Sequence, residues 1–251
     1  MKKYGSVLTT TLIMSSVFRP AIAENRPSAF DVPLFLAFDV LYGGYKIGEI
    51  DITQSQPFEY ESQTVRELEC RVESSVIIDH HGLYRSIVND SYSLLYMRAD
   101  NSTAGKRRID EYWFDHQEQN VRIRTEIPST GQKSDYLKDL SGTHDTYFDT
   151  ISMIFRLRDG LDTLRAPVYV PVFVYSRQDS ILIKNIIDAA APGPDGVNKP
   201  ARLISGYIPF NTFPGAGNEF EIYISDDEEK IPLRAQMEMV LGRVEIVPRR
   251  Q

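Results

Sequence analysis

The stretch LFLAFDVLYGGYKIGEIDIT at residues 34–53 decides the fold class. Two β-prone runs, 34–42 and 45–53, flank the pair Gly43-Gly44. Type I′ and II′ turns need positive φ angles, which glycine adopts at little cost, so the stretch predicts a β-hairpin. Further β-prone runs, broken by turn residues, lie at 64–76, 83–88, 91–97, 107–115, 120–127 and 168–175.

Two of these runs carry specific information. In 120–127 apolar and charged residues alternate, a period of two that puts one face on a core and the other in water. Residues 168–175 are apolar at almost every position, which predicts a strand covered on both faces, with Pro171 at an edge or a bulge. The stretch AAAPGPDG at 189–196 is expected to be a loop between strands.

One segment, Thr146 to Asp159, lacks the pattern of a β-strand. Its apolar residues recur at helical spacing: Tyr147, Ile151, Ile154 and Phe155. Thr146 and Asp149 fit a capping box, and Gly160 fits a helix stop. We therefore expect an all-β fold, an antiparallel curved sheet or barrel-like β domain with one packed α-helix, as a single domain over residues 34–251.

The first residues predict export. Lys2 and Lys3 are followed by an apolar stretch at 7–18 and by Ala21-Ile22-Ala23, the three parts of a secretory signal peptide. The apolar stretch is shorter than the ~20 residues that span a bilayer, although a retained anchor is the alternative. We expect cleavage after Ala23, a polar lead at 24–33, a periplasmic location and no transmembrane span in the mature chain.

Charge and cysteine content exclude some classes of protein. The chain has 28 basic and 35 acidic residues, and the predicted leader holds three of the basic ones, so the mature net charge is 25 − 35 = −10. Such a surface repels nucleic acid, and we expect no nucleic-acid partner. Cys70 is the only cysteine, which rules out an internal disulfide and predicts a small buried residue in a strand.

Four stretches in order resemble a bacterial exported family known only as domain of unknown function 3108. They are FDVLYGGYKIGEIDI at 38–52, YWFD at 112–115, DTISMIFRLR at 149–158 and IYISDDEEKIPLRAQMEMVLGRVEIV at 222–247. The turn at 226–229 is longer and more acidic than the family pattern, and residues 192–196 form an insertion. The resemblance implies an envelope location and a β-rich, barrel-like fold, and it implies no activity.

Two clusters could suggest a metal site, and we expect no metal or cofactor at either. The acidic run 226–229 lacks the spaced oxygen pattern of calcium loops and is typical of a solvated hairpin turn. His80 and His81 are adjacent, and neighbouring residues of a strand point to opposite faces, which disfavours joint ligation of one ion.

The predicted helix carries the candidate ligand site. Asp149, Ser152 and Arg156 lie at i, i+3 and i+7, on one face offset from the apolar one. If that face lines a barrel mouth, the three side chains can bind the polar head of a ligand. The alternative is structural: Asp149 caps the helix, Arg156 pairs with acids of a strand, and Arg158 opposes the helix dipole.

The leading functional hypothesis is a non-enzymatic periplasmic protein that binds a lipid or a lipid-linked glycan of the cell envelope. It depends on the predicted export, on the curved β architecture and on missing catalytic motifs such as G-x-S-x-G. The 14 Tyr and 12 Phe residues suit core packing and also sugar or lipid binding. The alternatives are a structural or interaction module in envelope assembly and an unrecognised hydrolase.

Overall fold

The computed structural model describes residues 34–74, 79–141, 144–210, 216–239 and 242–249. The predicted signal peptide, its cleavage after Ala23 and the polar lead lie outside these residues. Within them, no helix has the length and apolar character needed to cross a membrane.

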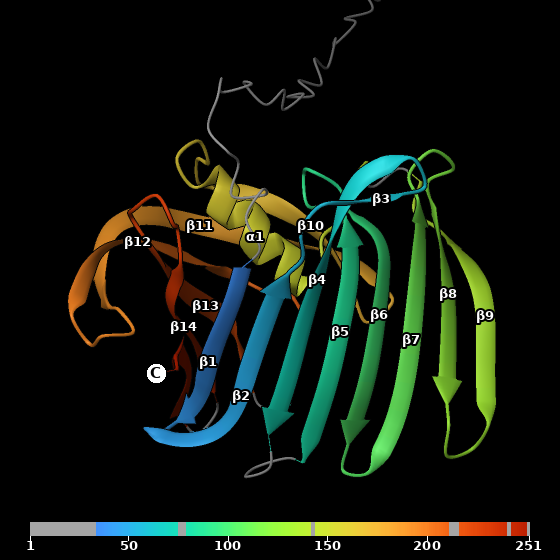
Figure 1. The fold of residues 1–251 in the computed structure, drawn as a ribbon, viewed down its shortest axis with the longest axis horizontal. Helices are drawn as coiled ribbons and strands as arrows, with labels where there is room; N and C mark the ends of the chain where they lie inside the picture. Colours follow the sequence, from blue (N-terminus) through green and yellow to red (C-terminus); the bar gives the residue numbers. More distant parts are fainter. Residues whose placement is uncertain (1–33, 75–78, 142–143, 211–215, 240–241, 250–251) are drawn as a thin grey trace, which may run out of the picture.

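The described residues form one antiparallel sheet of fifteen strands, which confirms the predicted antiparallel β class (Figure 1). The order is β10-β11-β12-β13-β14-β15-β1-β2-β4-β5-β6-β7-β8-β9, with β3 paired to β4 beside this path. The bounds are β1 Leu34–Tyr42, β2 Tyr45–Gln54, β3 Phe58–Tyr60, β4 Gln63–Ser74, β5 His80–Val88, β6 Leu94–Thr103, β7 Lys106–Asp115, β8 Asn120–Ile127, β9 Gln132–Asp139, β10 Val168–Val174, β11 Arg177–Pro192, β12 Asn198–Tyr207, β13 Ala216–Ser225, β14 Pro232–Met239 and β15 Gly242–Pro248.

The hairpin predicted at the start of the chain is confirmed. Gly43 and Gly44 form its turn with φ angles of 57° and 84°, the region that favours glycine. β1 and β2 then pair from Tyr42↔Tyr45 to Leu34↔Gln54. β1 also pairs with β15, the last of the described strands, so the two ends of the β-rich region meet in the middle of the sheet.

The sheet curls, and its two ends overlap without joining in a hydrogen-bond ladder. The turn between β10 and β11 lies against the face of β7–β9 that carries Tyr112 and Lys138. Lys138 Nζ donates to the carbonyl oxygen of Ser176 at 2.7 Å, and Tyr112 Oη lies 3.3 Å from Ser176 Oγ. The Phe173 ring packs edge-on against the rings of Tyr112 and Phe114. The fold is therefore an unclosed, scroll-like variant of the barrel-like sheet that the sequence predicts.

The one helix among the described residues, α1, spans Thr150–Gly160 and begins later than predicted. Asp149 is the N-cap and forms the capping box with Ser152, so the predicted pair of Thr146 and Asp149 is wrong. The reason is a competing β contact. Phe148 N–H donates to the carbonyl of Pro171, and Phe173 N–H donates to the carbonyl of Phe148, which holds the chain extended before the helix.

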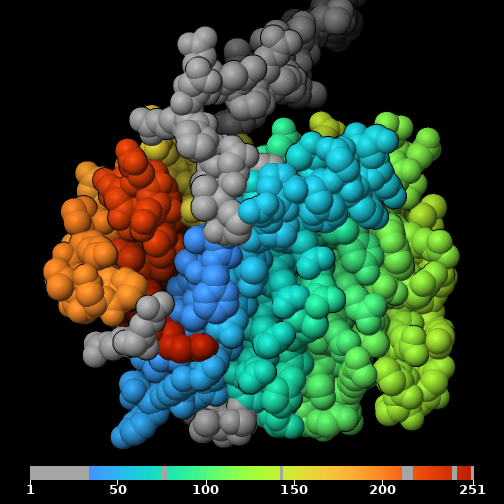
Figure 2. All heavy atoms as spheres, viewed as in Figure 1, coloured from blue at the N-terminus to red at the C-terminus, as the bar shows by residue number. Residues whose placement is uncertain are grey.

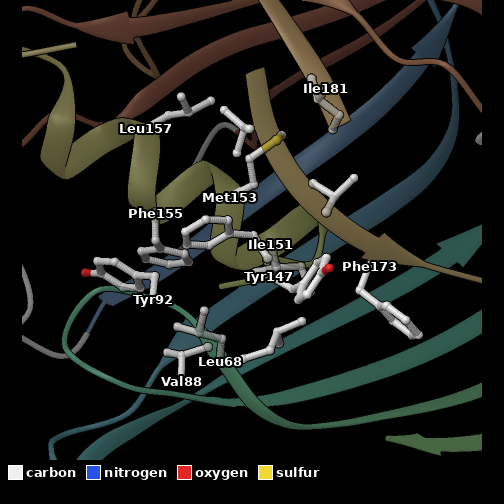
Figure 3. Close-up of a cluster of buried hydrophobic side chains, with 14 of the residues drawn as sticks. Leu68, Val88, Tyr92, Tyr147, Ile151, Met153, Phe155, Leu157, Phe173 and Ile181 are labelled. Atoms are coloured by element: carbon white, nitrogen blue, oxygen red, sulfur yellow. The ribbon is translucent and has the colours of Figure 1, made fainter. Parts of the chain in front are cut away.

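The core lies between α1 and the inner face of the sheet. Figure 3 shows Met153, Phe155 and Leu157 of α1 pointing into a buried apolar cluster. The ring of Phe155 stacks on that of Tyr92 with centroids 5.7 Å apart. Cys70 of β4 is buried in the same core, as predicted, and burial raises the pKa of its thiol to about 12.

The outer face of β4–β9 is charged. One cross-strand row runs across all six of these strands, and it consists of Glu69, Arg85, Arg98, Glu111, Arg124 and Asp135. Arg85 Nε donates to Glu69 Oε2 at 2.8 Å, a contact typical of the row. Strands in this region form the continuous surface on the right of Figure 2.

Two strand predictions need correction. β11 continues through Ala189, Ala190 and Ala191, which pair with β12 and are not a loop; Ala191 is buried in a small second cluster with Ala201. β10 is an edge strand, as Pro171 requires, but it is covered on both faces only near its end. Its second residue, Tyr169, is 66% exposed.

Candidate functional site

The structure brings Asp149 and Ser152 together inside the protein. Asp149 Oδ1 accepts from Ser152 N–H at 2.6 Å, and Asp149 N–H donates to Ser152 Oγ at 2.9 Å. The Ser86 hydroxyl of β5 donates to the other carboxylate oxygen of Asp149. All three residues are buried, so their polar atoms serve to cap the helix and attach it to the sheet.

The two arginines of α1 differ. Arg158 is buried, and its Nε and Nη2 donate to the carbonyl oxygen of Glu229 at 3.3 and 3.0 Å. Arg156 is half-buried, and its positive charge acts on the carboxyl of Asp159, three residues further along the chain. Ligand binding by Asp149, Ser152 and Arg156 therefore stays a prediction, with a structural role established for the first two.

In the two clusters considered as metal sites, the side chains bind protein groups and do not converge on a common point. His80 Nδ1 lies 2.8 Å from Thr103 Oγ1, whereas the adjacent His81 pairs with Asp79 at 3.2 Å. The acidic run 226–229 forms the turn between β13 and β14, where Asp227 Oδ1 accepts from the backbone of Glu229 and Lys230. Over the described ranges, no group of three or more His, Cys, Asp or Glu residues is arranged to hold a metal.

A different surface, on the outer face of β10–β12, has the form of a binding site. Tyr169 of β10 lies opposite Leu182 of β11, and Leu182 lies opposite Tyr207 of β12. The three side chains form one cross-strand row and line an open groove of ≈ 580 Å³. Its other lining residues are His144, Gln178, Asp179, Ser180 and Pro209. We call this the aromatic groove.

The polar rim of the aromatic groove is held by hydrogen bonds, one of which reaches the core. Gln178 Nε2 donates to the hydroxyl of Tyr147 at 3.1 Å, and Tyr147 is itself buried. Ser180 Oγ lies 3.4 Å from His144 Nε2, and the Ser180 N–H donates to Asp179 Oδ1. The groove thus combines exposed tyrosine rings with hydrogen-bonding groups held in place, a combination typical of small-ligand sites.

A second groove of ≈ 470 Å³ lies on the same face, over β11–β15. It is polar, and its lining residues are Lys184, Asn185, Ser205, Gly206, Glu219, Phe220, Glu221, Gln236, Met237, Glu238 and Arg243. Lys184 Nζ donates to Glu219 Oε1 at 2.7 Å, which holds the pKa of the Glu219 carboxyl below its usual value. Arg243 Nη1 donates to Gln236 Oε1 at 3.1 Å. We call this the polar groove.

The comparison with family profiles shows to which protein family the chain belongs. Residues 37–247 match the family described as "Protein of unknown function (DUF3108)", the family that the four sequence stretches resemble. The chain belongs to the DUF3108 family. Membership assigns no activity, because the family description contains none.

The other comparisons concern relatives and fold. No curated protein sequence matches this DUF3108 chain. A similar solved structure is the crystal structure of a beta-barrel-like protein of domain of unknown function DUF1849 from Brucella abortus, with a TM-score of 0.51 and 9% identity. The match covers 87% of this chain and 96% of that chain. At this identity the likeness shows the fold alone, and it agrees with a barrel-like antiparallel sheet.

Sequence reasoning missed both grooves. The apolar neighbours Val168 and Val170 predict a covered side chain for Tyr169, whereas the structure leaves it exposed. Tyr207 comes from a strand that the sequence did not single out. The available signal was that Tyr169 has a polar tip at a position whose neighbours are purely aliphatic, which suits an exposed site on an edge strand.

Proposed function

We propose that this DUF3108 protein is exported to the periplasm and binds, without catalysis, a glycan built from N-acetylated amino sugars. The glycan is the carbohydrate part of an envelope component such as a lipid-linked glycan. The observation that carries the proposal is the row of Tyr169, Leu182 and Tyr207 in an open groove with a polar rim.

The row suits a sugar ring in shape and polarity. Tyr169 and Tyr207 are 66% and 39% exposed, so apolar ring surface is left in contact with water. A sugar ring has a C–H face that packs on an aromatic ring, and its edge carries hydroxyls that need hydrogen bonds. The rim supplies these partners through Gln178, Asp179 and Ser180, and the amide of Gln178 also complements an acetamido group.

The charges of the two grooves favour a neutral ligand. The aromatic groove contains Asp179 and no Lys or Arg among its lining residues. The polar groove contains Lys184 and Arg243 against three glutamates. Two basic side chains against four acidic ones give a surface that disfavours a phosphorylated headgroup, so we assign the groove to the sugar portion of an amphiphile.

The test uses the purified mature chain and the β-linked tetramer of N-acetylglucosamine, with affinity measured by isothermal titration calorimetry. We expect binding, and we expect Tyr169→Ala or Tyr207→Ala to weaken it at least about tenfold, as for aromatic side chains at the centre of a contact. The matched control is Tyr45→Ala, because Tyr45 is 80% exposed at the far hairpin of β1 and β2.

Three outcomes overturn the proposal. They are no binding of the tetramer, binding that survives both groove substitutions, and binding that Tyr45→Ala weakens equally. Release of shorter sugars from the tetramer would support the alternative of a hydrolase. Export is tested separately, by cell fractionation and by N-terminal sequencing of the mature protein. The protein is expected in the periplasmic fraction with Glu24 as its first residue, and an intact Met1 would overturn the export proposal.

One observation favours the second candidate function, an interaction module in envelope assembly. β9 ends the sheet and pairs only with β8 among the described strands, so its outer edge can accept a strand from a partner. Lys133, Asp135, Lys138 and Asp139 make this edge charged, and charged edges oppose such pairing. We therefore rank it below glycan binding.

A further inference from the structure

We infer that the aromatic groove and the polar groove form one extended site, which binds an oligosaccharide running across the strands from β10 to β15. This inference rests on the proposed function and deepens it, because it specifies a chain of several sugars as the ligand and assigns the polar groove to its distal units.

Lys184 joins the two grooves. It follows Leu182 by two residues on β11, so both side chains lie on the outer face. Its Nζ lies 5.8 Å from the centroid of the Tyr207 ring, which lines the aromatic groove, and 2.7 Å from Glu219 Oε1, which lines the polar groove. A ligand that leaves the tyrosine row along β12 and β13 therefore meets the polar groove directly.

The polar groove offers both donors and acceptors that suit sugar hydroxyls and acetamido groups. Arg243 Nε donates to Glu238 Oε1 at 2.8 Å, and Asn185 Nδ2 donates to Ser205 Oγ at 3.2 Å. Gln236 is only 9% exposed and lies between Glu221 and Arg243, with which it forms hydrogen bonds. These contacts hold the groups in fixed positions while leaving lone pairs and N–H groups for a ligand.

The width of the site excludes a single sugar as the complete ligand. Tyr169 is on β10 and Arg243 on β15, five strands further along the sheet order. Neighbouring strands are about 4.8 Å apart, so the two residues are separated by about 24 Å along the sheet. Only an oligosaccharide reaches from one to the other.

The experiment is a length series of N-acetylglucosamine oligomers, from monomer to hexamer, titrated into the mature chain. We expect affinity to rise from the trimer to the hexamer by about tenfold or more. Arg243→Ala and Glu238→Ala are expected to remove this gain and leave trimer affinity unchanged, whereas Tyr169→Ala weakens binding of every oligomer. Arg122→Ala is the matched control, because Arg122 is also an exposed arginine in an ion pair, with Asp135, outside both grooves.

The outcomes separate the two proposals. If Tyr169→Ala weakens binding but affinity stops rising at the trimer, or if the hexamer gain survives Arg243→Ala and Glu238→Ala, the extended site is wrong and the aromatic site stands. If no oligomer binds, both proposals are wrong. Equal loss with Arg122→Ala would trace the effect to surface charge and would also overturn the extended site.

Discussion

Tyr169 and Tyr207 face the same side of the sheet in one cross-strand row, each directly opposite Leu182. The row lies on the outer face of the scroll, where the strands β4–β9 carry a charged row instead. The inner face already holds the core, so folding does not require apolar side chains at these outer positions. This separation of folding from surface chemistry can be tested by mutation.

Substitutions at Tyr169 and Phe173, four residues apart on β10, should have different effects on stability. Phe173 is 1% exposed, so Phe173→Ala is expected to lower the free energy of unfolding by about 3–5 kcal/mol. Tyr169→Ala should change it by no more than about 0.5 kcal/mol, as for an exposed residue. Urea unfolding followed by circular dichroism measures both. Equal losses would mean that Tyr169 is part of the core.

Removal of the N-cap should destabilise the protein. Asp149→Ala removes the acceptor for the N–H of Ser152, and it also removes the acceptor for the buried Ser86 hydroxyl. We expect the free energy of unfolding to fall by about 2–4 kcal/mol. Asp149→Asn retains a capping side chain and should lose less. Asp145→Ala is the control, because Asp145 is exposed in the same segment. A loss below that of the control would contradict the capping role.

The two arginines of α1 provide a second matched pair. Arg158→Ala removes two hydrogen bonds from a buried guanidinium to the carbonyl oxygen of Glu229 in the β13–β14 turn, and we expect a loss of about 1–3 kcal/mol. Arg156→Ala should change stability by about 0.5 kcal/mol or less. Thermal unfolding compares them. A larger loss for Arg156→Ala than for Arg158→Ala would contradict the structural role assigned to Arg158.

The protein should lose stability at high pH. Burial, the largest cause, raises the pKa of Tyr112 to about 12, and burial likewise raises the pKa values of Tyr84 and Tyr92. These tyrosines keep their protons in the folded chain while unfolded tyrosines ionise near pH 10, so their contribution is complete below about pH 10 and is lost as pH rises toward 12. Phenolate absorbance and unfolding midpoints should change together. Ionisation of all tyrosines near pH 10 with the fold intact would contradict this prediction.

Cys70 should be unreactive in the native protein. Its thiol is buried with a pKa of about 12, so the reactive thiolate is scarce at neutral pH. A chromogenic disulfide reagent should label it only after unfolding in urea. Rapid labelling of the native chain would place Cys70 at the surface and contradict the core described above.

Local signals in the sequence predicted the sheet well. Gly43-Gly44 defines its hairpin because positive φ is a local requirement, and residues 120–127 became β8 because alternation reports directly on one buried face. β9 was not predicted, because it is almost entirely exposed and its sequence QKSDYLKD has no apolar alternation. The alanines at the end of β11 resembled a loop, since pairing with β12 rather than propensity keeps them extended.

The helix start and the grooves depend on contacts that no local pattern contains. Tyr147 is apolar and buried at helical spacing, yet it packs from an extended segment held by the backbone of β10. Asp149 and Ser152 could be assigned to one helix face from their spacing, but their contact with Ser86 required the fold. The aromatic groove joins residues of three strands through strand register, and single-sequence patterns do not give register between strands.

The most direct test of glycan binding is nuclear magnetic resonance of the isotope-labelled mature chain during titration with the N-acetylglucosamine tetramer. The account predicts saturable shifts of the Tyr169, Leu182 and Tyr207 signals, with smaller changes at Lys184 and with the charged outer row near Arg98 unaffected. Absence of saturable shifts, or shifts confined to residues away from β10–β12, would contradict it.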